Sequence, residues 1–256
     1  MSDTSFFTVE ISDKLAVVTY TRPPINMLSF QALGQLEDIL TALSRRETLS
    51  VVVLTGGVPG YFAAHADVED VMRMENGQPP IGDPDAWDRV NALLTDMPQL
   101  TVAAVNGQAW GGGCETALAC NLLLLSEAGH LRLLEVSKGV LPGAGGTQRL
   151  PRRVGVARAL EMLLTSRVVR GQEALDWGLA DALLPEAQFL EAVRAWLAPI
   201  LAQPVHAVHA AKAAVIQGSR LPLDEGLALE KALFQKLVSC EATKALGEKT
   251  VEILEP

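Results

Sequence analysis

Two glutamates and a run of three glycines are the residues of this chain best suited to chemistry. Glu115 lies two residues after the glycines at positions 111–113, and Glu135 follows 20 residues later. Glycine lets a ligand approach bare backbone, and the first turn of a helix leaves N–H groups unpaired at the positive end of the helix dipole. Such N–H groups can hold an anion, and carboxylates can move protons. The pattern therefore predicts a site that stabilises negative charge beside groups that transfer protons.

Each of these features also has a structural explanation that involves no chemistry. A glycine triplet can be a tight turn from a strand into a helix, and a glutamate early in a helix compensates the helix dipole. Glu135 comes just after an apolar strand, so it can be a surface charge at a strand end. Only the spacing of both glutamates, together with the motifs around them, chooses between these interpretations.

The segments before and between these residues predict strands. Residues 7–11 and 15–20 are rich in β-branched and aromatic side chains and predict a hairpin. The runs 50–55, 101–105 and 122–126 are apolar on both faces and are separated by segments of helix length. Strands of this kind favour a largely parallel sheet that is covered on both sides.

Helices are predicted before and after this region. Ser29 can cap a helix in which Leu33, Leu36, Ile39, Leu40 and Leu43 recur at helical spacing. From Val154 onward the pattern predicts helices only, over residues 157–165, 172–177, 188–202, 205–216 and 224–238. Residues 74–85 are rich in glycine and proline and predict a loop.

Composition limits the class of protein. The 256 residues are 49% hydrophobic, which is enough for a large buried core, and the net charge of −9 argues against binding to nucleic acid or an anionic membrane. No apolar run reaches the roughly 18 residues of a membrane span. Residues 1–5 lack the features of a signal or transit peptide, so the cytoplasm is expected. Three scattered cysteines and four histidines predict no metal site.

Further motifs accompany the two glutamates in a fixed order from about residue 17 to about residue 183. They are Arg22-Pro23-Pro24-Ile25-Asn26-Met27-Leu28, Val51-Val52-Val53-Leu54-Thr55-Gly56, Phe62-Ala63-Ala64-His65-Ala66-Asp67-Val68 and Ala174-Leu175-Asp176-Trp177-Gly178-Leu179-Ala180-Asp181. Together with the glycine triplet, the set resembles the crotonase superfamily, specifically the enoyl-CoA hydratases. Any one of these motifs is weak, whereas the ordered set is strong.

The resemblance implies a fold and an assembly. The fold is the crotonase-like (ClpP/crotonase) α/β fold, a spiral of ββα units that forms two nearly perpendicular sheets, with a helical C-terminal region. We therefore expect a core with an acyl-CoA site over residues 1–183. A helical region over residues 184–256 would then cover the site or form trimers. The resemblance also implies a homotrimer or a dimer of trimers.

Carried over residue by residue, the resemblance gives each part of the site a role. Glu115 would activate water, and Glu135 would protonate the α-carbon of the acyl group. The backbone N–H groups of Ala66 and Gly112 would form an oxyanion hole, which stabilises charge on the thioester oxygen. The remaining substrate-binding residues would be Ala64, His65, Asp67 and Val68, with the Ala64 carbonyl accepting a hydrogen bond from the adenine amino group.

The sequence departs from the family pattern at several positions. His65 replaces the usual glycine, and we expect a structural substitution, since histidine tolerates unusual φ angles better than most residues. Leu134 replaces the proline before the second glutamate, residues 131–133 replace a Phe-Gly approach, and Asn121 stands where aspartate is common. The usual basic ending is missing from residues 239–256. The arginines that could instead contact coenzyme A, or simply form a solvated face, are Arg149, Arg152, Arg153 and Arg158.

These features predict an enoyl-CoA hydratase, a hydro-lyase that reversibly adds water to a trans-2-enoyl-CoA and gives a 3-hydroxyacyl-CoA. No cofactor is expected, because coenzyme A is part of the substrate. An enoyl-CoA isomerase is the nearest alternative, although it needs only one carboxylate. A catalytically degenerate acyl-CoA-binding protein is the other alternative, and His65 and Leu134 support it. A serine hydrolase on the related Clp-protease fold is disfavoured, because no serine follows the glycines.

Overall fold

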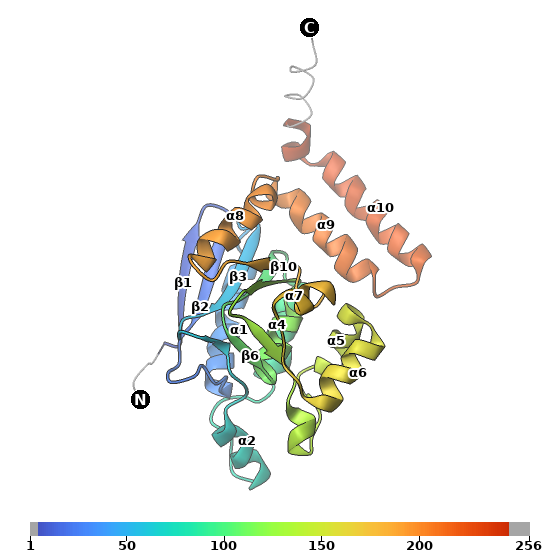
Figure 1. The fold of residues 1–256 in the computed structure, drawn as a ribbon. Coiled ribbons are helices and arrows are strands. Elements are labelled where there is room, and N and C mark those ends of the chain that lie inside the picture. Colours follow the sequence, from blue (N-terminus) through green and yellow to red (C-terminus); the bar gives the residue numbers. More distant parts are fainter. Residues whose placement is uncertain (1–4, 246–256) are drawn as a thin grey trace.

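A six-stranded sheet forms the centre of the protein (Figure 1). The computed structural model describes residues 5–245. The strand order is β1-β2-β3-β5-β7-β10, in which β1 and β2 form the predicted antiparallel hairpin and the other neighbours are parallel. The strands are β1 (Phe7–Ser12), β2 (Leu15–Tyr20), β3 (Val51–Gly56), β5 (Leu100–Val105), β7 (Leu122–Ser126) and β10 (Ala182–Leu184).

A smaller sheet of four short strands lies beside the first. Its order is β4 (Tyr61–Ala63), β6 (Gln108–Trp110), β8 (His130–Arg132) and β9 (Val169–Arg170). Strands β3, β5 and β7 of the large sheet each continue into β4, β6 and β8 of the small one, and a helical segment follows each pair. This is the repeated ββα unit that the family resemblance implies, and it brings the ends of β4, β6 and β8 together in the small sheet.

Both faces of the large sheet are covered, as the doubly apolar strands predict. Along β3, Val52 and Leu54 face one hydrophobic cluster, whereas Val51 and Val53 face another. Helix α1 (Phe30–Ser44) packs in the first cluster through its predicted leucine stripe, and the Ser29 hydroxyl caps it by accepting the Ala32 N–H at 3.2 Å. Helix α8 (Phe189–Leu201) packs in the second cluster.

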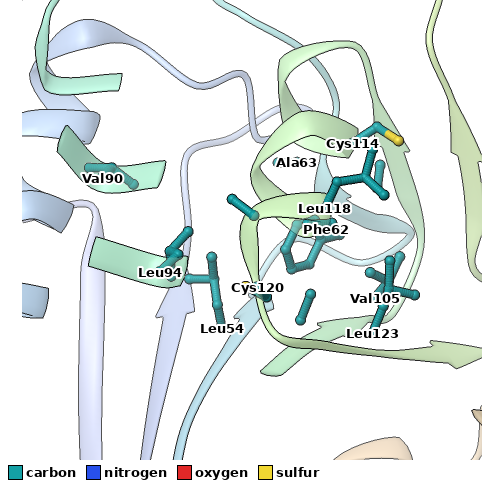
Figure 2. Close-up of a cluster of buried hydrophobic side chains, with 14 of the residues drawn as sticks. Leu54, Phe62, Ala63, Val90, Leu94, Val105, Cys114, Leu118, Cys120 and Leu123 are labelled. Atoms are coloured by element: carbon teal, nitrogen blue, oxygen red, sulfur yellow. The ribbon is translucent and has the colours of Figure 1, made fainter. Parts of the chain in front are cut away.

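Helix α4 (Gly112–Ala119) is buried along its whole length. All eight of its residues are buried, and Figure 2 shows Cys114 and Leu118 of this helix among Phe62, Leu94 and Val105. Helix α3 (Ala86–Asp96) packs beside it. Since α4 is held on all sides, the groups at its N-terminus have fixed positions.

The remaining helical segments are α2 (Val68–Glu75), α5 (Gly146–Val154), α6 (Val156–Thr165), α7 (Gly171–Asp176), α9 (Val205–Gly218), α10 (Leu223–Ser239) and the 3₁₀ helix η1 (Glu135–Lys138). Helices α9 and α10 form a hairpin that extends from the rest of the molecule (Figure 1). The expected division of the chain at residue 183 falls within β10 and stays a prediction. The unusual ending lies outside the described residues from position 246 onward.

None of the helices between residues 5 and 245 has the length and apolar character that a bilayer crossing requires.

Candidate active site

The glycine triplet forms the turn from strand β6 into helix α4. Gly111 has a φ of +50°, a left-handed conformation that favours glycine, and its N–H donates to the Arg132 carbonyl at 2.8 Å. Gly113 lies against backbone, because a Cβ added there would be 2.0 Å from the Ala63 carbonyl oxygen. Side chains are thus excluded at both positions, and the turn presents bare backbone as the sequence predicts.

Gly112 is the first residue of α4. Within residues 5–245 its N–H makes no hydrogen bond, as expected for the first turn of a helix that has no side-chain cap. A Cβ added at Gly112 would lie 2.3 Å from Cζ2 of Trp87, so the indole ring covers this glycine. The N–H of Gly112 therefore has no acceptor in the described part of the chain and lies at the positive end of the α4 dipole.

The stretch that contains Ala66 runs beside the glycine turn. The Ala64 carbonyl accepts the Trp110 N–H at 3.1 Å, and Ala66 forms an isolated bridge with Leu28. This bridge leaves the Ala66 N–H without an acceptor in the described part of the chain. The Ala64 carbonyl is buried and already accepts one hydrogen bond, and its expected contact with adenine stays a prediction.

His65 lies next to this turn without backbone strain. Its φ lies outside the left-handed region, so the tolerance for unusual φ that we expected to matter is not needed. Its Nδ1 is 2.6 Å from the Ala66 carbonyl oxygen, which can only accept, so Nδ1 carries the proton in this contact. Its Cβ would be 3.6 Å from a Cβ added at Gly111, which places the base of the His65 side chain beside the glycine turn.

Asp67 and Val68 begin helix α2. The buried Asp67 carboxylate caps the helix by accepting the Glu69 N–H at 2.9 Å, and it forms an ion pair with Arg22 at 2.5 Å. Val68 is 51% exposed. The ion pair between Arg22 and Asp67 joins the sequence motif at residues 22–28 to the stretch that contains Ala66. That Asp67 and Val68 contact the substrate stays a prediction.

Glu115 is buried in the first turn of α4, with 3% of its surface exposed. Its Oε1 accepts the N–H groups of Ala144 and Gly146, each at 2.8 Å. Burial raises the pKa of Glu115 to about 7, and the charge of Glu135 also raises it. The two N–H groups and the charge of Arg149 act in the opposite direction. A carboxyl with a pKa near neutrality suits general acid–base chemistry at physiological pH.

Glu135 begins the 3₁₀ helix η1 and points toward the glycine turn. A Cβ added at Gly111 would lie 2.9 Å from its Oε1, and its Oε2 is buried without a hydrogen-bond partner among residues 5–245. Burial raises the pKa of Glu135, whereas the backbone N–H groups of Glu135 and Leu134 and then the charge of His65 act in the opposite direction. The structure therefore brings both predicted glutamates to the same turn, Glu115 with two N–H donors on Oε1 and Glu135 with no partner for Oε2.

The arginine cluster serves other contacts. Arg149 donates to the Ala144 carbonyl at 2.8 Å, Arg153 pairs with Asp181, and Arg158 lies 5.6 Å from the centroid of the Trp177 ring. Arg149, Arg152 and Arg153 line a cavity of about 780 Å³ together with the last residues of α4. This is the end of α4 opposite Gly112, so these three arginines line a cavity away from the glycine turn.

Two residues near the site were missed by sequence reasoning. Trp87 covers Gly112, and Asn91, one turn later on α3, donates from Nδ2 to the Ala144 carbonyl at 3.0 Å. Their spacing of four residues on one helix was the only signal in the sequence, because their partners lie 25 and 53 residues away.

Comparison with known proteins identifies the family. The chain belongs to the enoyl-CoA hydratase/isomerase family, whose model matches residues 10–254. YngF of Bacillus subtilis is 35% identical over 254 residues, which are 97% of each chain. The cucumber glyoxysomal fatty acid beta-oxidation multifunctional protein MFP-a is 36% identical over 203 residues, 77% of this chain. The chain spans 28% of the length of that relative. The resemblance drawn from the motifs is thus confirmed.

Solved structures have the same fold. An enoyl-CoA hydratase of Geobacillus kaustophilus matches with a TM-score of 0.88 and 30% identity, over 100% of this chain and 97% of that chain. A protein of Thermobifida fusca in complex with acetoacetyl-CoA matches with a TM-score of 0.81 and 28% identity, over 91% of this chain and 94% of that chain. The predicted crotonase-like fold is therefore confirmed.

Proposed function

We propose that this protein is an enoyl-CoA hydratase, which reversibly adds water to a trans-2-enoyl-CoA and gives a 3-hydroxyacyl-CoA. One observation carries the proposal: Glu115, whose pKa burial raises to about 7, shares one backbone turn with a second carboxyl, Glu135. Family membership supports the reaction class. The acetoacetyl-CoA complex of the Thermobifida fusca protein supports an acyl-CoA ligand.

The thioester oxygen would bind between the N–H groups of Ala66 and Gly112, neither of which has an acceptor within residues 5–245. Water addition moves an electron pair from the double bond toward the thioester, so negative charge gathers on this oxygen. Backbone donors that are fixed before the reaction stabilise such charge strongly, because they need no reorganisation. The enclosed position of α4 supplies this rigidity.

The two carboxyls would divide the proton transfers. Ionised Glu115 takes a proton from water while the water oxygen bonds to the β-carbon of the acyl group. Protonated Glu135 gives its proton to the α-carbon as the enolate collapses to the thioester. Protons and charge balance, because Glu115 gains the proton that Glu135 loses, and exchange with solvent restores the starting state. The proposed mechanism uses no metal or other cofactor.

The test is the ultraviolet absorbance of the conjugated thioester when crotonyl-CoA is mixed with the protein. A hydratase removes the double bond, so the absorbance decays steadily to an equilibrium value. The control is the double variant Glu115→Gln/Glu135→Gln, which keeps both side-chain shapes and loses both proton transfers. Binding of crotonyl-CoA without decay would favour an acyl-CoA-binding protein. Gain of the same absorbance from a 3-enoyl-CoA, with no decay of crotonyl-CoA, would favour an isomerase.

A further inference from the structure

Helix α3 contacts the loop that holds Glu115. Asn91 lies in the middle of α3 with 1% of its surface exposed, and its Nδ2 donates to the Ala144 carbonyl at 3.0 Å. This carbonyl belongs to the peptide unit between the two N–H groups that bind Glu115, those of Ala144 and Gly146. The Asn91 amide therefore fixes the orientation of the turn from which both N–H groups point.

Asn91 is poorly explained by stability alone. Its Oδ1 is buried and has no hydrogen-bond partner in the described part of the chain. A buried polar atom without a partner costs about 1–3 kcal/mol, so an apolar residue of similar size would suit this position better if packing were its only purpose. Buried groups that break such a rule concentrate at functional sites.

A second donor to the same carbonyl does not replace Asn91. Arg149 also donates to the Ala144 oxygen at 2.8 Å, but it comes from α5, the helix that continues directly from this turn. Asn91 comes from a different element, which is packed against α4. It therefore ties the 144–146 turn to the helix that carries Glu115, whereas Arg149 ties the turn to its own continuation.

We propose that Asn91 is a positioning residue that holds the 144–146 turn against Glu115 and so keeps this glutamate aimed and ionised for water activation. The catalytic part of this statement rests on the proposed function. Hydrogen bonds to a carboxylate favour its charged form, so a looser turn would leave Glu115 protonated at higher pH. The charged groups around Glu115 are Glu135 and Arg149, and Arg149 in turn faces Asp88, Asp96 and Arg220. Asn91 adds no charge to this set.

The experiment uses two variants and a direct readout of Glu115. Asn91→Leu removes the donor at similar volume, and Asn91→Ala removes the whole amide group without adding a charge. Protein labelled with ¹³C at the glutamate carboxyls would be titrated by NMR, with the Glu115 signal assigned by its loss in Glu115→Gln. We expect the Glu115 midpoint to rise by about one pH unit in either variant. Turnover on the acidic side of the profile should fall on the order of tenfold.

Thr95→Val is the matched control. Thr95 lies one turn further along α3, and its Oγ1 is 2.8 Å from the Asn91 carbonyl oxygen and 3.0 Å from the Ala119 carbonyl oxygen, so its loss removes a contact between α3 and α4 but leaves the Asn91 side-chain amide in place. Thr95→Val leaves the 144–146 turn unchanged, so the midpoint of the Glu115 titration should not move. An unchanged midpoint in folded Asn91 variants would overturn the proposal. A shifted midpoint in a protein that never hydrates crotonyl-CoA would instead overturn the proposed function and leave the positioning role standing.

Discussion

The indole ring of Trp87 fills the space in which a side chain on Gly112 would begin. An added Cβ would lie 2.3 Å from Cζ2 and 2.4 Å from Cη2 of Trp87, closer than non-bonded carbon atoms approach one another. Gly112 is the first residue of α4, and its N–H is the proposed oxyanion donor. The contact between Trp87 and Gly112 therefore fixes the start of α4. Glycine is needed at position 112 for packing against the indole ring as well as for access of a ligand to the backbone.

We expect Gly112→Ala to lower turnover on the order of 10²-fold, because the indole must move and the oxyanion donor is displaced. Overpacking of this kind also costs about 1–3 kcal/mol of stability. Trp87→Leu added to Gly112→Ala should recover part of both losses, since leucine leaves room for the new methyl group. Crotonyl-CoA hydration and thermal unfolding would measure the two effects.

Gly34→Ala is the control for this prediction. Gly34 lies in α1, and a Cβ added there has no atom within 4 Å, so the substitution should stabilise the helix slightly and leave turnover unchanged. A double variant that is no more active than Gly112→Ala would show that the contact with Trp87 is not the cause of the loss.

Substitution of either glutamate tests the division of proton transfers. Glu115→Gln and Glu135→Gln should each lower hydratase turnover by about 10²-fold or more, because each keeps the shape and removes one proton transfer. Binding of coenzyme A should change little. Glu127→Gln, at an exposed position after β7, is the control and should leave the rate unchanged. A variant within a few-fold of the parent would remove that glutamate from the mechanism.

The sequence predicts the parts of the site whose signal is local. The glycine turn, Glu115 and Glu135 lie within 25 consecutive residues and have side-chain types and spacing suited to their chemistry. The long apolar strands and the leucine stripe of α1 were equally predictable, because their periodicity repeats over several residues.

Other elements could not be predicted from the local sequence pattern. Strands β4, β6 and β8 have three residues each, too few for alternation to show, and they exist because their neighbours in the small sheet pair with them. Helix α5 begins with glycine and contains Pro151, which argue against a helix, but its buried Leu150 and Val154 anchor it in the core. Asn91 resembles any polar residue of an amphipathic helix until the chain brings Ala144 to it.

The raised pKa of Glu115 predicts how stability depends on pH. This carboxyl has an ordinary pKa of 4.5 and a folded pKa of about 7, so between these values the folded protein holds a proton that the unfolded chain has released. Its contribution to stability therefore falls as pH rises through this window and is constant above it. At about 1.4 kcal/mol per pH unit, the effect is on the order of 3 kcal/mol.

Glu115→Gln removes this dependence. We expect the variant to gain stability relative to the parent as pH rises from about 4.5 to 7, since the neutral amide has no charge to bury. Urea unfolding at several pH values and one fixed protein concentration would measure the difference. A difference that stays constant across the window would mean that Glu115 titrates at its ordinary value in the folded protein.

Helix α10 presents an apolar surface that the single chain leaves open. No residue of α10 is buried, and its side chains of Leu223, Leu227, Phe234 and Val238 are between 51% and 79% exposed. Helices α9 and α10 project from the core as a pair (Figure 1). Contiguous exposed apolar surface is typical of protein–protein interfaces. We expect the homotrimer, or dimer of trimers, that the family resemblance implies.

Light scattering at micromolar concentration should return three or six times the chain mass of 27.3 kDa. Phe234→Glu places a charge in the centre of the α10 surface, and it should shift the mass toward that of one chain, because burying an unpaired charge in an apolar interface is costly. Ile81→Glu, at a 45% exposed position outside α10, is the control and should keep the parental mass. A parent that scatters as a monomer would remove the prediction, whereas an oligomer that Phe234→Glu leaves intact would place the interface elsewhere.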